Sequence, residues 1–131
     1  EKPKMKLSEI IEKYQCQVYT KELLREKEIK YAFCADLMSD ALMVLNSVKD
    51  DRVLIDSILI TGLTTNQSIR TAEMLDMEVV LLVRGKIPSL KVVELAKESN
   101  IILLSTEHTM FNTSGMMYQD GIKGIIYNQQ W

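Results

Sequence analysis

Residue types that usually mark a particular chemistry are scarce in this 131-residue chain, which has two cysteines, one histidine and two prolines. Cys16 and Cys34 are far apart and share no short metal-ligand spacing with each other or with His108. Zinc fingers and CxxC redox sites are therefore excluded, and the sequence predicts no metal site. We expect the two cysteines to be small buried side chains of a reduced protein.

Long apolar runs and an excess of one charge are also missing. No stretch reaches the roughly 18 apolar residues of a membrane span, and no secretory signal is recognisable, so we expect a cytoplasmic protein. Sixteen basic and eighteen acidic residues give a net charge of −2 at pH 7. That balance argues against a nucleic-acid or membrane-surface partner. GxxxxGK[ST], GxGxxG and GxSxG motifs are absent as well, so the sequence predicts no cofactor.

What the sequence does contain is one unit repeated three times. Apolar runs at 53–60, 79–83 and 101–104 are each followed by a polar turn and a segment of helical period. The run at 79–83 is apolar on both faces, which is typical of strands covered by helices on two sides, and helical connections force parallel pairing. The sequence therefore predicts an α/β fold with three α/β/α layers and a mainly parallel sheet built from βα repeats.

Local signals refine this prediction. Ser89 is placed to cap a helix over 90–98, and Gly121 to end the last helix in a left-handed conformation. The first half is less regular, with a predicted helix over 8–14 capped by Ser8 and another that opens at Ala35 or Asp36. Short strands are predicted over 17–19 and 28–30.

No linker divides the chain, so we expect one domain over 5–124. Residues 1–4 are interpreted as an expression remnant or a flexible tail, and 125–131 as a C-terminal tail in which Trp131 docks on a partner, folds back or stays disordered. Methionines at helical spacing are expected mainly in the core.

Because parallel strands present their carboxyl ends at one edge, the three polar turns are expected to line one cleft. Their hydroxyls, amides and two cations suit a small anion. The residues that we expect to bind such a ligand are Thr61, Gly62, Thr64, Thr65, Asn66, Arg84, Gly85, Lys86, Ser105, Thr106 and His108.

Simpler roles stay open for these residues. Thr64 or Thr65 can cap the following helix while Gly62 serves a turn, and exposed basic side chains are often only solvated. Any nucleophilic catalysis would have to use His108, for which capping or packing is an equally simple role. Asp36 and Asp40 would share a helix face that could hold Mg²⁺, although a capping or surface role is the simpler interpretation.

Six segments, in order, resemble the DRTGG domain family over residues 5–124. They are Lys6-Leu7-Ser8-Glu9-Ile10-Ile11, Asp36-Leu37-Met38-Ser39-Asp40, Ile60-Thr61-Gly62-Leu63-Thr64 with Arg70-Thr71-Ala72-Glu73, Val83-Arg84-Gly85-Lys86 and Leu103-Leu104-Ser105-Thr106.

One segment departs from the pattern, because Glu26 to Phe33 contains no Asp-Arg pair and no glycine. A turn or a close ligand approach that depends on glycines of the family in this segment is therefore not expected here. The resemblance implies the three-layer α/β fold of the amino-terminal domain of HPr kinase/phosphorylase and a non-catalytic module. Such modules occur beside CBS pairs in regulated pyrophosphatases and beside the catalytic domain of some phosphotransacetylases, and also as small stand-alone proteins.

The first hypothesis is a regulatory or interaction module that forms a homodimer and senses a small anionic metabolite or nucleotide at the carboxyl edge of the sheet. A structural subunit that binds a protein partner without any ligand is the alternative. An enzyme that acts on a phosphorylated small molecule is the third.

Overall fold

A six-stranded sheet forms the centre of the computed structural model, which describes residues 4–48 and 50–125. The strand order is β2-β7-β6-β5-β4-β8, and every pair is parallel except the edge strand β2, which runs antiparallel to β7. The strands are β2 (Gln17–Val18), β4 (Tyr31–Cys34), β5 (Ser57–Thr61), β6 (Val79–Leu82), β7 (Ile102–Ser105) and β8 (Lys123–Gly124).

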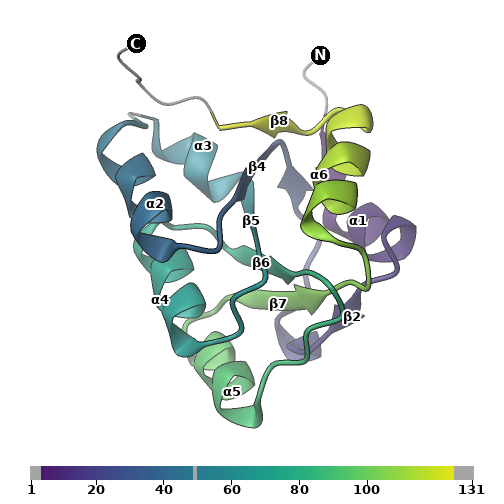
Figure 1. Cartoon of the computed structure of the whole chain (residues 1–131), viewed down its shortest axis with the longest axis vertical. Coiled ribbons are helices and arrows are strands. Elements are labelled where there is room, and N and C mark those ends of the chain that lie inside the picture. The colour runs from purple at the N-terminus through teal and green to yellow at the C-terminus, as the bar shows by residue number, and fades with distance from the viewer. Residues whose placement is uncertain (1–3, 49, 126–131) are drawn as a thin grey trace.

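Helices cover both faces of this sheet (Figure 1). They are α1 (Leu7–Lys13), α2 (Met38–Met43), α3 (Asp51–Ile55), α4 (Asn66–Met74), α5 (Leu90–Glu98) and α6 (Met110–Gln119), with short 3-10 turns η1 (Lys21–Leu23) and η2 (Val44–Asn46). Side chains of α2, α4 and α5 pack on one face, and those of α1 and α6 on the other. A small ribbon of β1 (Met5–Lys6) and β3 (Glu28–Ile29) lies on the α1 side. The predicted three-layer α/β fold is confirmed.

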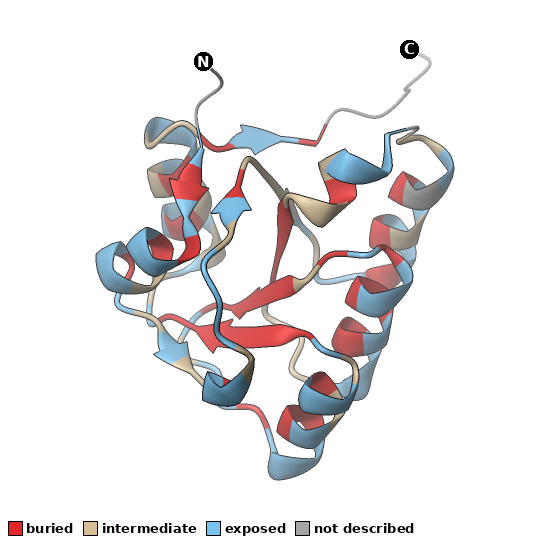
Figure 2. Ribbon diagram, turned by 180° about the vertical axis from the view of Figure 1, so that it is seen from behind, coloured by how far each residue is buried: buried red, intermediate tan, exposed pale blue. Residues whose placement is uncertain are grey.

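The central strands are buried on both sides, as their apolar pattern predicted (Figure 2). Along β5, Leu59 faces the α4 layer, whereas Ile58 and Ile60 face the α1 layer. The same alternation runs through β6 and β7. Each fully buried Val, Leu or Ile side chain contributes about 1.5–3 kcal/mol. These strands therefore hold the two helical layers together.

Four helices end in the same way, with one residue of positive φ after the last turn. These residues are Gln15 (55°), Asp76 (59°), Asn100 (60°) and Gly121 (104°). In each case the next N–H donates back to a carbonyl of the last helical turn, for example Ile122 N to Met117 O at 2.9 Å. This is the Schellman arrangement, which satisfies the free carbonyls and turns the chain into the next buried residue. The predicted end at Gly121 is confirmed, as is the Ser89 cap, whose hydroxyl accepts the Val92 N–H.

The prediction of a strand over 53–60 was wrong in its first part. Asp50 accepts the N–H of Arg52 at 3.0 Å and so starts α3, which places Val53 in a helix. The strand β5 begins only at Ser57. Only Asp56 and Ser57 separate the apolar residues of α3 from those of β5, so the sequence pattern predicts a single strand across both.

Strand β4 was not predicted as a separate element, and the helix expected from Ala35 or Asp36 begins at Met38. Asp36 and Asp40 therefore share no helix face, and the Mg²⁺ interpretation that rested on it is wrong. Ser8 is not the cap of α1, because the helix already begins at Leu7 and the Ser8 hydroxyl donates to Glu26.

The expectation that both cysteines are buried was wrong, because Cys16 is half-buried and Cys34 is exposed. Cys16 packs against the α1-side core, where burial raises its pKa to about 12. Cys34 is exposed, and its Sγ lies 3.1 Å from Oγ of Ser114. Of the expected C-terminal tail, Ile125 is buried in the core, and Trp131 lies outside the described residues.

Two glycine substitutions near the same helix should have opposite effects. Gly121→Ala places a Cβ at a positive φ, and we expect it to lower the free energy of unfolding by about 1–2 kcal/mol. Gly115→Ala, inside α6 where a Cβ meets nothing within 4 Å, should raise it by about 0.5–1 kcal/mol. Urea unfolding measures both values, and equal effects would contradict the assigned end of α6.

Candidate functional site

Adjacent strands β6 and β7 send the chain to opposite faces of the sheet. The loop after β6 leads to α5 on one face, and the loop after β7 leads to α6 on the other. In open α/β sheets, ligands bind outside the carboxyl ends of strands at such a switch point. The topology thus selects the edge at which the three predicted turns lie.

The turn after β5 is held by a carboxylate that the sequence analysis did not place in the site. Asp36, in the loop after β4, accepts the N–H of Gly62 at 2.7 Å and the hydroxyl of Thr61 at 3.3 Å. The Thr61 oxygen in turn accepts the N–H of Leu63. Thr61 is buried and fixes the loop from inside. Recognition of β4 as a strand would have placed Asp36 at this edge.

Arg84, at the end of β6, reaches back over this turn. A Cβ added to Gly62 would lie 3.1 Å from Nη2 of Arg84 and 3.3 Å from Oδ1 of Asp36, so glycine here makes room for both groups. Arg84 is exposed, and its guanidinium makes no hydrogen bond or ion pair within residues 4–48 and 50–125. One turn therefore carries a free cation beside a carboxylate that is already hydrogen-bonded.

The backbone at Arg84 is strained. Arg84 (φ 62°) and Gly85 (φ 66°) both have positive φ, the backbone of a type I′ turn, in which Asn-Gly is the preferred pair. Their N–H groups donate to the carbonyls of His108 and Thr106, each at 2.8 Å. These two bonds fasten the β6 loop to the β7 loop. An arginine in the left-handed region costs roughly 1–2 kcal/mol, and such strain persists mainly at functional positions.

In the turn after β7, two of the predicted hydroxyls serve the fold. Ser105 Oγ lies 3.0 Å from the hydroxyl of Tyr19, and Thr106 donates its hydroxyl to the Tyr14 carbonyl at 2.7 Å. Both residues are buried. The His108 N–H lies 3.4 Å from Thr106 Oγ1, and the helix begins beyond it, with Thr109 as its cap.

The remaining predicted residues lie at the same edge but are held less tightly. Thr65 occupies the N-cap position of α4, as predicted, but its side chain makes no capping hydrogen bond. Thr64 is half-buried, and Asn66 and Lys86 are exposed. The three turns thus lie along one edge, with Arg84 over Gly62 and Gly85 beside Thr106 and His108.

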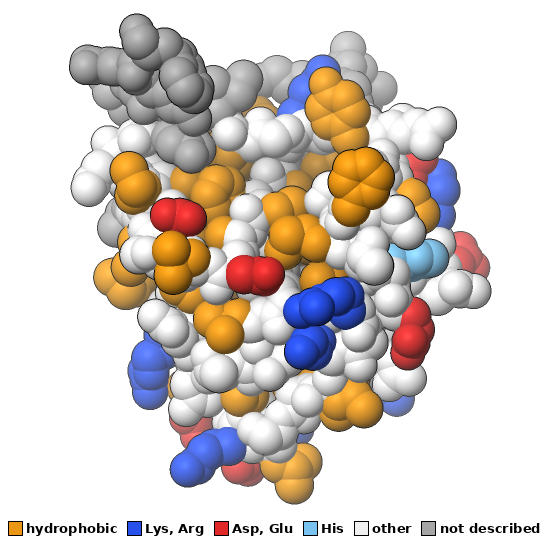
Figure 3. Space-filling model, viewed as in Figure 1, with side chains coloured by type: hydrophobic (Ala, Val, Ile, Leu, Met, Phe, Trp, Pro, Cys, Tyr) orange, Lys and Arg blue, Asp and Glu red, His pale blue; other side chains and the backbone are white. Residues whose placement is uncertain are grey.

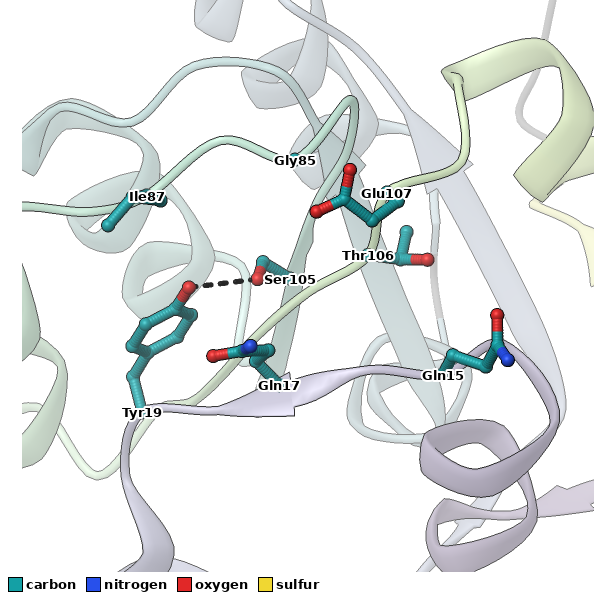
Figure 4. A pocket seen from close by; sticks show the side chains of 8 residues that line it. All are labelled: Gln15, Gln17, Tyr19, Gly85, Ile87, Ser105, Thr106 and Glu107. Carbon is teal, nitrogen blue, oxygen red and sulfur yellow. Dashed lines mark hydrogen bonds between the residues drawn. The ribbon is translucent and has the colours of Figure 1, made fainter.

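A pocket of about 220 Å³ opens beside the β6 and β7 loops (Figure 4). Three residues from the amino-terminal part contribute to its wall, because β2 pairs with the outer side of β7. Glu107 supplies the one charged side chain, and it leans against Gly85, where an added Cβ would lie 3.0 Å from its Oε1. The lining residues are Gln15, Gln17, Tyr19, Gly85, Ile87, Ser105, Thr106 and Glu107.

A second hollow, of about 350 Å³, lies at the opposite edge of the sheet and is lined partly by Glu73, Asp76 and Glu78. Across residues 4–48 and 50–125, no three His, Cys, Asp or Glu side chains are grouped closely enough to hold a metal ion. In the same part of the chain, every helix is too short or too polar to cross a membrane.

Helix α1 supports the β7 loop through a buried tyrosine. Tyr14, whose carbonyl holds Thr106, donates its hydroxyl to Asp120 at 2.6 Å, and Lys13 bonds the other oxygen of Asp120 at 2.8 Å. The hydrogen bond from Lys13, followed by that from Tyr14, lowers the pKa of Asp120. Burial and the hydrogen bond to Asp120 raise the pKa of Tyr14. This cluster ties α1 to the end of α6.

Comparison with known proteins supports the fold. No protein-family model and no curated protein matches the sequence. The structure is similar to the crystal structure of the CBS and DRTGG domains of the regulatory region of Clostridium perfringens pyrophosphatase, complexed with the activator diadenosine tetraphosphate. The TM-score is 0.61 at 18% identity, over 88% of this chain and 47% of that one. This chain thus spans about half of that chain, and it folds as a DRTGG-like α/β domain.

Relief of the strain at Arg84 should stabilise the protein. Arg84→Asn introduces a residue that tolerates positive φ and forms the favoured Asn-Gly pair, so we expect the free energy of unfolding to rise by roughly 0.5–1 kcal/mol. Arg52→Ala, on an exposed helix elsewhere, should change it less. A lower stability of Arg84→Asn in urea unfolding would show that the guanidinium serves the fold.

The Asp120 cluster should make stability depend on acid. Because the folded pKa of Asp120 is lowered below its ordinary 3.8, its contribution is present above that pH and is lost as pH falls through the folded pKa. Asp120→Asn should therefore be less stable than wild type near pH 6, with a difference that shrinks toward pH 2. Urea unfolding across this range measures it, and parallel curves would contradict the assignment.

Proposed function

We propose that this chain is a non-catalytic regulatory module that binds a small anionic metabolite or nucleotide at the carboxyl edge of its sheet. The observation that carries the proposal is Arg84, an exposed cation on a strained turn at the switch point, which has no ion-pair or hydrogen-bond partner for its guanidinium among the residues that the structure describes. A similarly folded regulatory region is complexed with a nucleotide activator, which supports the same role here. The module acts in the cytoplasm as a homodimer.

Within this site the residues divide into two groups. Arg84, Lys86 and Asn66 are exposed and supply two cations and an amide to the ligand. Gly62 leaves the space in which the guanidinium lies. Thr61, Ser105 and Thr106 keep their hydroxyls in internal bonds and hold the loops, as does Gly85 through its backbone N–H. Thr64, Thr65 and His108 also belong to the proposed site.

A second candidate function is that of a structural subunit that binds a protein without a ligand. Several large apolar side chains are exposed, among them Leu37 and Met43 near α2 and Phe111 and Tyr118 on α6. Figure 3 shows hydrophobic side chains over both helices and in the hollow between them. Apolar surface of this kind often marks an interface. Light scattering of the purified chain distinguishes a homodimer from a monomer that awaits another partner.

Thermal unfolding with ATP, inorganic pyrophosphate or ribose 5-phosphate tests the binding proposal. A ligand that binds only the folded state stabilises it by about 2.7 kcal/mol at a hundredfold excess over Kd. We expect a rise in Tm with at least one of these compounds at millimolar concentration, which Arg84→Asn removes and the distant Arg52→Ala retains. If no compound raises the Tm, or if both variants respond alike, the anion site at Arg84 is wrong.

A further inference from the structure

The pocket beside β2 differs in chemistry from the turn that carries Arg84. Its lining includes no lysine or arginine, and its one charged side chain is the carboxylate of Glu107. A carboxylate in a recessed site repels a phosphate, because the interaction between charges strengthens away from bulk water. The anion of the proposed ligand therefore belongs outside this pocket, at Arg84.

What the pocket offers is a set of neutral hydrogen-bonding groups between apolar surfaces. Gln17 and Gln15 supply carboxamides, and the paired hydroxyls of Tyr19 and Ser105 keep spare lone pairs. Figure 4 shows Tyr19 and Gln17 rising from the β2 segment, with Ile87 contributed by the loop after β6. The Tyr19 ring also packs against the core, which holds it in place.

Size and chemistry together restrict the ligand. About 220 Å³ is below the roughly 300–1,000 Å³ of sites that enclose a drug-sized molecule, so the pocket takes one ring system and not a whole nucleotide. Carboxamides and carboxylates bind the edges of nucleobases, and tyrosine rings stack on their faces. Nucleobases are neutral, flat and rich in N–H donors, as this lining requires.

We propose that this pocket binds the nucleobase of a nucleotide whose phosphates extend along the edge to Arg84. This inference rests on the proposed function and adds the ligand class and three residues, Gln17, Tyr19 and Glu107. Neighbouring strands are about 4.8 Å apart, so the path from the outer side of β7 to the Arg84 turn spans on the order of 10 Å. Lys86, which lies between the lining residues Gly85 and Ile87 in the sequence, is exposed.

The test separates the two halves of such a ligand. Binding is measured by calorimetry for adenosine and guanosine, which lack the anion, for ribose 5-phosphate, which lacks the base, and for AMP and GMP. We expect one nucleoside to bind weakly and its monophosphate to bind at least tenfold more tightly. Gln17→Ala should weaken binding of the nucleoside and of its monophosphate but not of ribose 5-phosphate. Arg84→Asn should weaken binding of the monophosphate and of ribose 5-phosphate but not of the nucleoside.

Because Gln17 is exposed, Gln17→Ala should leave the fold intact, so a change in binding reports on the pocket. If ribose 5-phosphate binds through Arg84 while nucleosides do not bind and Gln17→Ala has no effect, the nucleobase pocket is wrong and the anion site stands. If nucleosides bind through Gln17 but neither phosphate depends on Arg84, the anion site is wrong and the pocket stands. Absence of binding by all five compounds overturns both.

Discussion

Burial of β5, β6 and β7 on both faces is the constraint from which the rest of the structure follows. Side chains such as Leu59 and Ile60 alternate between two apolar layers, so the sheet needs helices on each side. The chain must therefore cross from one layer to the other, and it does so after β7. That crossing creates the switch point, and with it the edge where Arg84, Gly85 and Glu107 lie together.

The elements predicted well were those whose signals are local. The apolar runs at β6 and β7, the Ser89 cap and the Gly121 end all depend on a few neighbouring residues. Strand β4 was missed because its residues are mostly half-buried, since β8 pairs only with Tyr31 and Ala32. Asp36 was then misplaced on a helix, although it follows directly on that strand.

The candidate site was predictable in outline only. The rule that parallel strands end at one edge brought the three turns together, but it could not show that Ser105 and Thr106 spend their hydroxyls on internal bonds. Nor could that rule show the pocket, because the pocket depends on the pairing of Gln17 with Ser105, which lie far apart in the sequence. The left-handed backbone of Arg84 likewise has no local sequence signal, since the turn geometry favours asparagine.

The central claim, that the ligand binds at the carboxyl edge, is tested most directly by amide chemical shifts during a titration with a nucleotide. The account predicts that the largest changes occur at Gly62, Gly85 and Glu107. The control is at the opposite edge, where the amide chemical shifts of Glu73, Asp76 and Glu78, which line the other hollow, should stay unchanged. Changes confined to that second group would contradict the account.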